Sequence, residues 1–278
     1  MKSIGVIGLG IIGSVYARNY AAAGVLVGTW NRTPQPAAPQ WRDTPEAVAA
    51  AADVVQIVVS DPPAVEAVLL RIAPVLGPGK IVVQSSTIDP AGSTRFAALV
   101  AARGARYLEA PFTGSKPAAE AKKTVFYLGG DPALMAEVEP VLALISEHRL
   151  AIGTGEQAAA MKLAMNVNLA VQIQGTCEAL TLARRAGIAD DVFFAIFARN
   201  MGYSPLIKLK EPKLRAGDFA PQFSVKHMLK DLRLASGIAG CEDFPALATV
   251  RERLAQAARA GYADEDYTAL IKLLAEKR

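Results

Sequence analysis

Up to about residue 152, short apolar runs alternate with stretches of helical periodicity. Short runs of aliphatic and β-branched residues, bounded by glycine, proline or aspartate, are typical of buried strands. These runs occupy residues 4–7, 25–30, 54–59, 81–84, 106–109, 125–128 and 149–152. Strands that alternate with helices favour a parallel sheet whose strands are connected by crossover helices. The pattern therefore predicts an α/β fold with a doubly wound parallel sheet.

Three helices of this half have well-marked starts. Residues 44–45, 89–90 and 131–132 are each a threonine or aspartate followed by proline, which places a capping side chain before the first helical position. A further helix is predicted over residues 12–23. Residues 33–44 differ, because three prolines exclude a regular helix there.

After Gly155 the strand pattern stops. Residues 156–185 keep a helical pattern throughout and are apolar over much of the helix surface. Further helices are predicted at 190–200, 224–239, 245–260 and 265–277. We therefore predict two domains, an α/β domain over residues 1–155 and an all-helical domain over 156–278 that begins with a long interdomain helix. The surplus of apolar surface favours burial against a second copy, in a homodimer or homotetramer.

Composition excludes several classes of protein. The 278 residues are 52% hydrophobic, and 30 basic against 26 acidic residues give a formal charge of +4. The charges are scattered without a basic run, so no nucleic-acid partner is predicted. No apolar stretch is long enough to span a membrane. Because Cys177 and Cys241 lack the spacing of metal ligands or of a disulfide framework, we expect a cytoplasmic protein without a metal site.

The first strand leads into a glycine-rich turn, with the sequence Gly8-Leu9-Gly10-Ile11-Ile12-Gly13. A strand, a GxGxxG turn and a helix form the arrangement that binds a dinucleotide. The first glycine allows the tight turn, the second lets the backbone approach the pyrophosphate, and the third lets helix and strand pack closely. The phosphates then lie on the N–H groups at the helix start. A glycine turn in an unrelated α/β protein is the alternative, but the position of this motif favours dinucleotide binding.

The end of the second strand indicates which dinucleotide is bound. An acidic residue there accepts hydrogen bonds from the ribose hydroxyls in NAD-specific folds. This chain has Asn31, Arg32 and Thr33 instead, with no carboxylate. The asparagine can bind a ribose oxygen, and the arginine offers a guanidinium group suited to a 2′-phosphate. The sequence therefore predicts NADP(H), although a polar turn with an incidental arginine is the simpler alternative.

Reduction of a carbonyl by a hydride also needs a proton donor. Lys162 and Asn166 lie four residues apart on the long helix and so share one face. Their neighbours are apolar, so we expect a half-buried lysine with a lowered pKa. On these grounds alone, a solvated helix lysine is the more common case. The acids Asp89 and Asp231 are interpreted as structural, the first as a helix cap.

Together, several segments resemble the β-hydroxyacid dehydrogenase family, which contains the 3-hydroxyisobutyrate dehydrogenases. They are the turn at 8–13 with Asn19, Ser85 to Pro90, Glu109 to Ser115, Met161-Lys162 with Asn166, and Lys230-Asp231-Leu232. They occur in the family's order over nearly the whole chain. Residues 31–33 and 114–120 resemble most closely the NADPH-dependent glyoxylate/succinic semialdehyde reductases. The resemblance implies a Rossmann-type domain followed by a helical domain, and an NADPH-dependent reductase of small anionic carbonyl compounds.

The resemblance also implies roles for individual residues. Lys162 matches the catalytic lysine that protonates the carbonyl oxygen, and Asn166 the residue that orients it. The substrate carboxylate would be held by the loop of Thr113, Gly114 and Ser115. Further implied contacts are Lys230 to cofactor and substrate, Thr87 to the nicotinamide side, and Val59, Ser60 and Val65 to the adenosine side.

The chain departs from the family pattern at a few positions. Phe112-Thr113 replaces the usual Val-Ser, and we expect the phenylalanine to narrow the substrate pocket. Glu156 and Ala158 stand where glycines usually precede the lysine, which is expected to reshape the interdomain turn. The departures leave the exact substrate open. The sequence also leaves open the direction of the reaction and whether the protein is a dimer or a tetramer. Two alternatives remain, an imine reductase, in which a lysine at this position is generally absent, and a non-catalytic NADP-binding protein.

Overall fold

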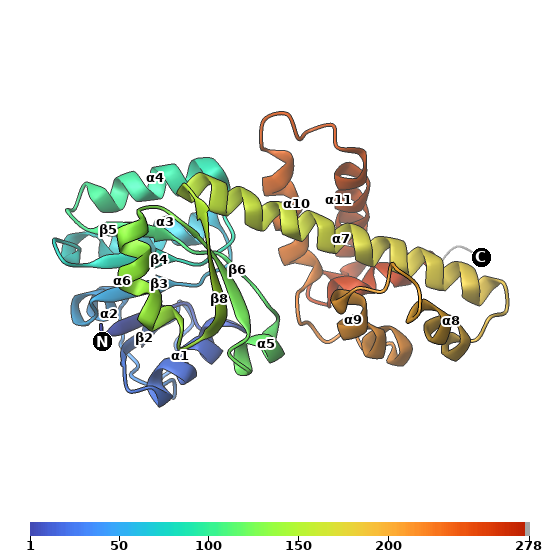
Figure 1. The fold of residues 1–278 in the computed structure, drawn as a ribbon, viewed down its shortest axis with the longest axis horizontal. Coiled ribbons are helices and arrows are strands. Elements are labelled where there is room, and N and C mark those ends of the chain that lie inside the picture. Colours follow the sequence, from blue (N-terminus) through green and yellow to red (C-terminus); the bar gives the residue numbers. More distant parts are fainter. Residues whose placement is uncertain (276–278) are drawn as a thin grey trace. The chain divides into compact units, whose positions relative to one another are not determined.

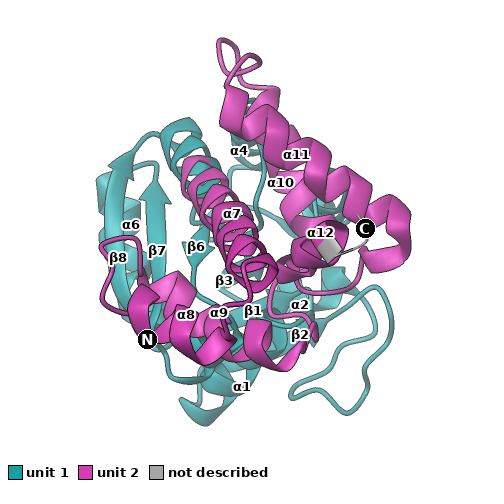
Figure 2. Ribbon diagram, turned by 90° about the vertical axis from the view of Figure 1, so that its right-hand side faces the viewer, with its two compact units in different colours: residues 1–163 teal, residues 164–278 magenta. Residues whose placement is uncertain are grey.

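The structure is a computed structural model that describes residues 1–275. The chain divides into two compact units, Met1–Leu163 (unit 1) and Ala164–Arg278 (unit 2), and Figure 2 colours them separately. The division falls within the long helix α7 (Gly155–Arg185), which contributes to both units. Within residues 1–275, none of the helices combines the length and the apolar character that a membrane span requires.

A sheet of eight strands forms the centre of unit 1 (Figure 1). The strands are β1 (Ile4–Ile7), β2 (Leu26–Trp30), β3 (Val54–Ile57), β4 (Ile81–Gln84), β5 (Arg106–Glu109), β6 (Phe112–Thr113), β7 (Thr124–Gly129) and β8 (Ser146–Gly153). Their order is β2-β1-β3-β4-β5-β7-β6, and β8 also pairs with β7. All seven predicted strands are present, and β1, β4 and β5 have the predicted bounds. The two-residue strand β6 was not predicted.

The sheet is not parallel throughout, which corrects the prediction at one edge. Strands β1 to β5 are mutually parallel, whereas β7 runs antiparallel to both β5 and β6. A parallel connection needs a crossover of about a dozen residues or more, usually containing a full helix. Between β5 and β7 the chain forms only β6 and the five-residue helix α5 (Lys116–Glu120), so it turns back on itself.

The remaining helices of unit 1 cover the two faces of the sheet. They are α1 (Gly13–Ala22), α2 (Pro45–Ala51), α3 (Pro62–Ile72), α4 (Pro90–Ala101) and α6 (Pro132–Leu142), with the short turn η1 (Ala73–Val75) after α3. Apolar residues of α1 and α6 pack on one face, and those of α2, α3 and α4 on the other. The three predicted caps are confirmed, because Thr44, Asp89 and Asp131 each accept a hydrogen bond from a backbone N–H of the helix that follows.

The parallel strands end level with one another. The paired residues at these ends are Ile7 with both Trp30 and Ile57, then Ile57 with Gln84, and Gln84 with Glu109. The loops that follow β1 to β5 therefore leave the sheet along the same edge. In open α/β sheets this carboxyl edge is where ligands bind.

Unit 2 is helical, as predicted. Besides its part of α7 it contains α8 (Asp190–Phe197), α9 (Pro205–Ala216), α10 (Val225–Ser236), α11 (Pro245–Ala257), η2 (Ala258–Tyr262), η3 (Tyr267–Ile271) and α12 (Lys272–Ala275). Helix α9 was not predicted, although Ser204 caps it and Pro205 occupies its first position. The predicted last helix, 265–277, is a 3-10 turn followed by α12, and its final two residues lie outside the described part. Cys177 is buried, whereas Cys241 is partly exposed.

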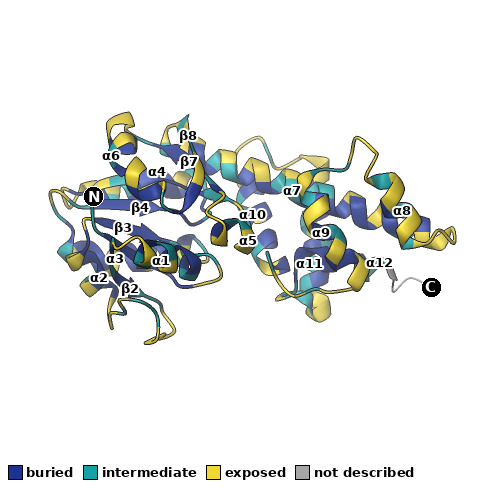
Figure 3. Ribbon diagram, turned by 60° about the horizontal axis from the view of Figure 1, so that its bottom comes forward, coloured by how far each residue is buried: buried dark blue, intermediate teal, exposed yellow. Residues whose placement is uncertain are grey.

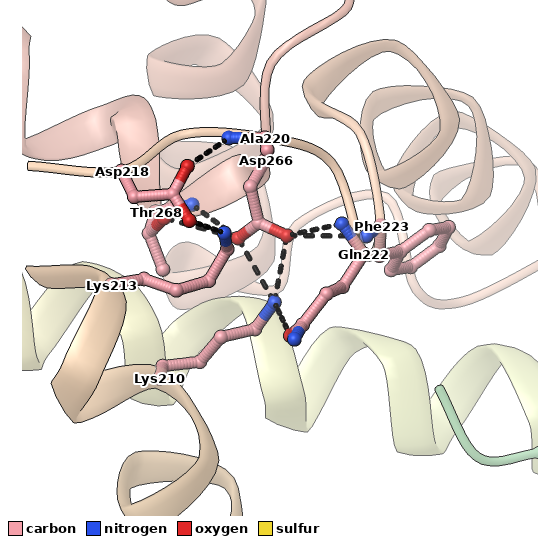
Figure 4. A network of polar contacts seen from close by, with 8 residues as sticks. All are labelled: Lys210, Lys213, Asp218, Ala220, Gln222, Phe223, Asp266 and Thr268. Atoms are coloured by element: carbon pink, nitrogen blue, oxygen red, sulfur yellow. Dashed lines mark hydrogen bonds and ion pairs between the residues drawn. The ribbon is translucent and has the colours of Figure 1, made fainter. Parts of the chain in front are cut away.

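A charged cluster lies in the interior of unit 2 (Figure 4). Asp266 is fully buried and forms an ion pair of 2.7 Å with the buried ammonium group of Lys210. Asp266 also accepts hydrogen bonds from the backbone N–H groups of Gln222, Phe223 and Thr268. The cluster therefore joins α9 and the start of η3 to the segment that leads into α10. Figure 3 colours the residues of both units by how far each is buried.

Candidate active site

The glycine turn after β1 has the geometry that a bound dinucleotide requires. Gly8 has a φ of +104°, and a Cβ atom there would lie 2.1 Å from the carbonyl oxygen of Val58. A Cβ atom on Gly13 would lie 2.0 Å from the Gly8 oxygen, so both positions exclude larger residues. Around Gly10 nothing lies within 4 Å of a Cβ position, which leaves room for a pyrophosphate.

The start of α1 suits an anion as well. No side chain caps its first turn and no acidic residue lies there. Of the remaining residues of the turn, Leu9 is buried, Ile12 is half-buried and Ile11 is exposed. The positive end of the helix thus meets the open space above Gly10 without a competing carboxylate. These residues fit NAD(P)(H).

Asn31 braces this turn. Its Oδ1 accepts a hydrogen bond from the Leu9 N–H (3.0 Å), and its Nδ2 donates to the Thr33 carbonyl (2.9 Å). Each polar atom of the Asn31 amide thus has one contact within the protein, and the contact with a ribose oxygen stays a prediction. Gln35, which the sequence analysis missed, donates to the Leu9 carbonyl at 3.3 Å. Arg32 and Thr33 are exposed just beyond the end of β2.

The loops after β3 and β4 contain three further predicted contacts, and helix α3 contains a fourth. The N–H of Val59 donates to Ser86 Oγ over 2.8 Å, so these two loops are joined. Ser60 is exposed, and Thr87 is partly exposed in the turn after β4. Val65 is fully buried in the apolar core between the sheet and helices α2, α3 and α4. Its side chain therefore packs with core residues and is not exposed at the surface.

The predicted carboxylate loop follows β6. Gly114 has a φ of +133°, and a Cβ atom there would lie 2.9 Å from Thr124 Cγ2. Thr113 ends the strand, and Ser115 precedes α5 without forming a side-chain cap. Glycine is therefore required at the centre of the loop, and the Ser115 hydroxyl is not used to cap the helix.

Phe112 packs against two buried aromatic rings. Its ring packs edge-on against Tyr16, with ring centres 5.3 Å apart, and against Phe126 at 5.7 Å. Tyr16 and Phe126 belong to the apolar cluster between the sheet and helices α1 and α6, and the partly buried Phe112 packs against this cluster. Alternate residues of a strand face opposite sides, so Phe112 and Thr113 diverge. Phe112 thus packs partly against the core, and the narrowing of the substrate pocket by its ring stays a prediction.

Helix α7 carries the predicted catalytic pair. Lys162 is half-buried, as expected, and Asn166 is only 1% exposed. Asn166 Nδ2 donates to Asp231 Oδ2 over 2.6 Å, which fixes the amide on the helix. The other oxygen of Asp231 forms an ion pair of 2.8 Å with Lys230.

Asp231, for which the sequence indicates only a structural role, thus connects two of the predicted site residues. A signal was available in the sequence, because Asp231 lies between Leu229 and Leu232 on the apolar side of α10, where an unpaired acid would be costly. Its partner could not be identified, since Asn166 lies 65 positions earlier.

Glu156 and Ala158, which stand before Lys162 where the family usually has glycines, both form contacts within unit 1. Glu156 lies in the exposed first turn of α7 and hydrogen-bonds with Thr94. Ala158 is buried against Gly129, where a Cβ atom would lie 2.7 Å from the alanine Cβ. Glycine on β7 therefore provides the space that the alanine methyl group occupies.

Two family models together match almost the whole chain. The NAD binding domain of 6-phosphogluconate dehydrogenase matches residues 3–154. The NAD-binding domain of NADP-dependent 3-hydroxyisobutyrate dehydrogenase matches residues 156–274. The matches support the glycine turn and its helix as a nicotinamide-dinucleotide site.

Individual relatives agree with these matches. Glyoxylate/succinic semialdehyde reductase 2, chloroplastic, from Arabidopsis thaliana is 31% identical over 98% of this chain and 79% of its own length. A 3-hydroxyisobutyrate dehydrogenase from Salmonella typhimurium is 28% identical and superimposes with a TM-score of 0.88 over 98% of this chain and 99% of that one. An imine reductase from Bacillus cereus shares the fold at 21% identity and a TM-score of 0.62, over 99% of both chains. The chain therefore belongs to the 3-hydroxyisobutyrate dehydrogenase-related family of NAD(P)-dependent β-hydroxyacid dehydrogenases.

Proposed function

We propose that the chain reduces a small aldehyde- or keto-acid, of the glyoxylate or succinic semialdehyde type, to the hydroxy acid with NADPH. The observation that carries the proposal is the pair on α7, a half-buried Lys162 followed four residues later by an amide that Asp231 fixes. The name of the Arabidopsis relative supports the substrate class.

Each residue has a distinct task in this proposal. When bound, NADPH supplies a hydride to the carbonyl carbon. Lys162 donates a proton from Nζ to the carbonyl oxygen, which becomes the hydroxyl group. Because Asn166 Nδ2 is held by Asp231, the amide oxygen becomes an acceptor of fixed orientation for a neighbouring donor. The backbone N–H groups of the 113–115 loop bind the carboxylate.

A panel of substrates tests this function. NADPH oxidation is followed with glyoxylate, with succinic semialdehyde and with a cyclic imine, and each is repeated with NADH. Reduction of the two acids supports the proposal. Turnover of the imine alone would favour an imine reductase, and absence of turnover with every compound would favour a non-catalytic NADP-binding protein.

The carboxylate of the substrate is expected to provide much of its binding energy. A charge-assisted hydrogen bond contributes about 1.5–3 kcal/mol, or about ten- to a hundredfold in affinity. Replacing succinic semialdehyde by its methyl ester should lower kcat/KM by about this factor, because the N–H groups of the 113–115 loop then face a neutral group. Equal kcat/KM values for acid and ester would show that the loop does not bind a carboxylate.

We also propose that NADPH is preferred over NADH, because the exposed guanidinium of Arg32 lies just beyond β2 with no acid in place of Asn31. Arg32→Ala should weaken NADPH about ten- to a hundredfold and leave NADH nearly unchanged, as fluorescence titration of both cofactors would measure. Arg18→Ala, which removes the same charge from the exposed side of α1, is the matched control. Equal losses for both cofactors would contradict the assignment.

Self-association is a further part of the proposal. Several large apolar side chains of unit 2 are exposed between α7 and the end of α8, among them Leu182, Val192 and Ile196. Burying them against a second copy would give a homodimer or homotetramer through the helical unit. Sedimentation would measure the state of association. The cytoplasmic location stays a prediction.

A further inference from the structure

Glu109 is a buried carboxyl group at the carboxyl edge of the sheet. It ends β5, directly before the stretch that leads to the 113–115 loop, and its side chain is 0% exposed. Gln84 lies beside it at the end of β4 and donates from Nε2 to Glu109 Oε1 over 2.9 Å. The Tyr107 hydroxyl donates to Glu109 Oε2 over 2.6 Å. None of the roles proposed above uses this group.

Through Gln84, the carboxyl group reaches the turn after β4. Gln84 Nε2 also donates to the Ser86 carbonyl (2.8 Å), and Gln84 Oε1 accepts from the Ser86 N–H (2.6 Å). One side chain therefore fixes both backbone groups of Ser86. The next residue is Thr87, the proposed contact on the nicotinamide side. Loss of Glu109 would remove one of the three hydrogen bonds that hold the Gln84 amide and would so loosen the turn.

Glu109 also lies under the first residue of α7. A Cβ atom on Gly155 would lie 2.6 Å from Ser93 Oγ and 3.3 Å from Glu109 Cβ. Ser93 is itself buried on α4, next to the Glu109 carboxyl group, where its hydroxyl favours the ionised form. Lys162 follows Gly155 by about two turns on the same helix. The first residue of α7, the helix that contains Lys162, thus packs closely against Glu109 and Ser93.

We propose that Glu109 is a positioning residue, which holds the Thr87 turn through Gln84 and the start of α7 through its contacts with Ser93 and Gly155. It touches neither substrate nor cofactor and acts through these neighbours. Its effect on turnover rests on the proposed reductase function, whereas its effect on the folded state does not.

The surroundings keep this carboxyl group protonated at neutral pH. Burial raises the pKa of Glu109 to about 8, against hydrogen bonds from Tyr107, Ser93 and Gln84 that favour the ionised form, and the charge of Asp89 raises it further. Burial also raises the pKa of Tyr107 well above its usual value, so its phenol stays neutral. The residues that meet Glu109 from β7 and α7 are glycines and bring no charge. A neutral acid has the same shape as a glutamine amide.

The first test compares Glu109→Gln with the native chain in thermal unfolding across pH. The folded pKa near 8 lies above the ordinary value of 4.5, so the native chain binds an extra proton and loses stability as the pH rises through this interval. Glutamine does not titrate, so the glutamine variant does not lose stability in this way as the pH rises. Its Tm relative to the native Tm should therefore rise steadily between about pH 5 and about pH 8.

Glu137→Gln is the matched control in the same unit. Hydrogen bonds from Arg106 and Lys2 lower the pKa of Glu137 to about 2. This carboxylate is ionised in both the folded and the unfolded chain above about pH 5, so the Tm deficit of the control should stay constant over the same range. A Tm difference that rises with pH at Glu109 and stays constant at Glu137 would identify Glu109 as the protonated group.

The second test uses turnover. Glu109→Gln should keep kcat within about threefold of the native value, whereas Glu109→Ala should lower kcat about ten- to a hundredfold, because a displaced catalytic group costs that much. The Kd for NADPH should change less than kcat, since Arg32 and the glycine turn are intact and only the Thr87 turn is loosened. If Glu109→Ala does not fold, Ser93→Ala takes its place in this test. It removes only one hydroxyl group and should also lower kcat.

A constant Tm difference for Glu109→Gln, parallel to that of Glu137→Gln, would overturn the proposal. Native kcat in folded Glu109→Ala would also overturn it. If the native chain reduces none of the candidate substrates, the proposed function fails by itself, and the pH course of the Tm difference still decides for or against Glu109.

Discussion

Replacing Lys162 by alanine is expected to abolish most turnover while NADPH still binds. The lysine is the proposed proton donor to the carbonyl oxygen, and loss of a general acid typically lowers the rate about a hundred- to ten-thousandfold. The glycine turn and Arg32 are unchanged, so the Kd for NADPH should remain near the native value. Steady-state kinetics with the best substrate of the panel, together with a fluorescence titration of NADPH, would measure both quantities.

Two companion variants separate proton transfer from charge. Lys162→Arg keeps a positive charge at the position, but a guanidinium group does not release its proton at neutral pH. We therefore expect the arginine variant to be nearly as slow as the alanine variant. Lys208→Ala removes an exposed lysine from α9 and should leave turnover unchanged. Substantial rescue by arginine would show that Lys162 acts by binding an anion.

A smaller loss would also be informative. If Lys162→Ala lowered turnover less than about tenfold at neutral pH, another group would have to donate the proton. The family assignment would stand, because it rests on matches over almost the whole chain. The proposed role of the α7 pair would fail.

Local signals of the sequence identified most elements of the fold. The apolar runs of β1, β4 and β5 and the Thr–Pro or Asp–Pro starts of α2, α4 and α6 depend on residues that are adjacent in the chain. The direction of β7 could not be predicted, because a buried strand has the same apolar pattern in either direction. Helix α9 was missed because Pro212 interrupts its interior, where proline is usually unfavourable.

The site shows the same limit. The glycine turn is a local motif, and its backbone geometry agrees with the sequence. The contacts that orient the site join distant residues, such as Asn166 with Asp231 and Gln84 with Glu109. The ring contacts of Phe112 could not be predicted, because its neighbours, Tyr16 and Phe126, are brought together only by the folded sheet. A sequence pattern shows which side chains can react, and tertiary contacts decide how they are held.

The ion pair of Lys210 and Asp266 is expected to have the largest effect on stability. Both side chains are almost completely buried, at 3% and 0% exposure. Removing one member leaves the other as an unpaired buried charge, which costs about 3–5 kcal/mol. We expect Lys210→Met and Asp266→Ala each to lower the free energy of unfolding by about this amount, as urea denaturation would measure.

The aspartate variant should be the less stable of the two, because Asp266 also accepts backbone hydrogen bonds from Gln222, Phe223 and Thr268. The double variant should lose less than the sum of the two single losses, since neither leaves its partner charge behind when both are removed. Arg259→Ala breaks an exposed ion pair with Glu252 and serves as the control, with little change expected. Additive losses in the double variant would mean that the two buried groups stabilise unit 2 independently, and the ion pair would then not account for the way the segment before α10 is held.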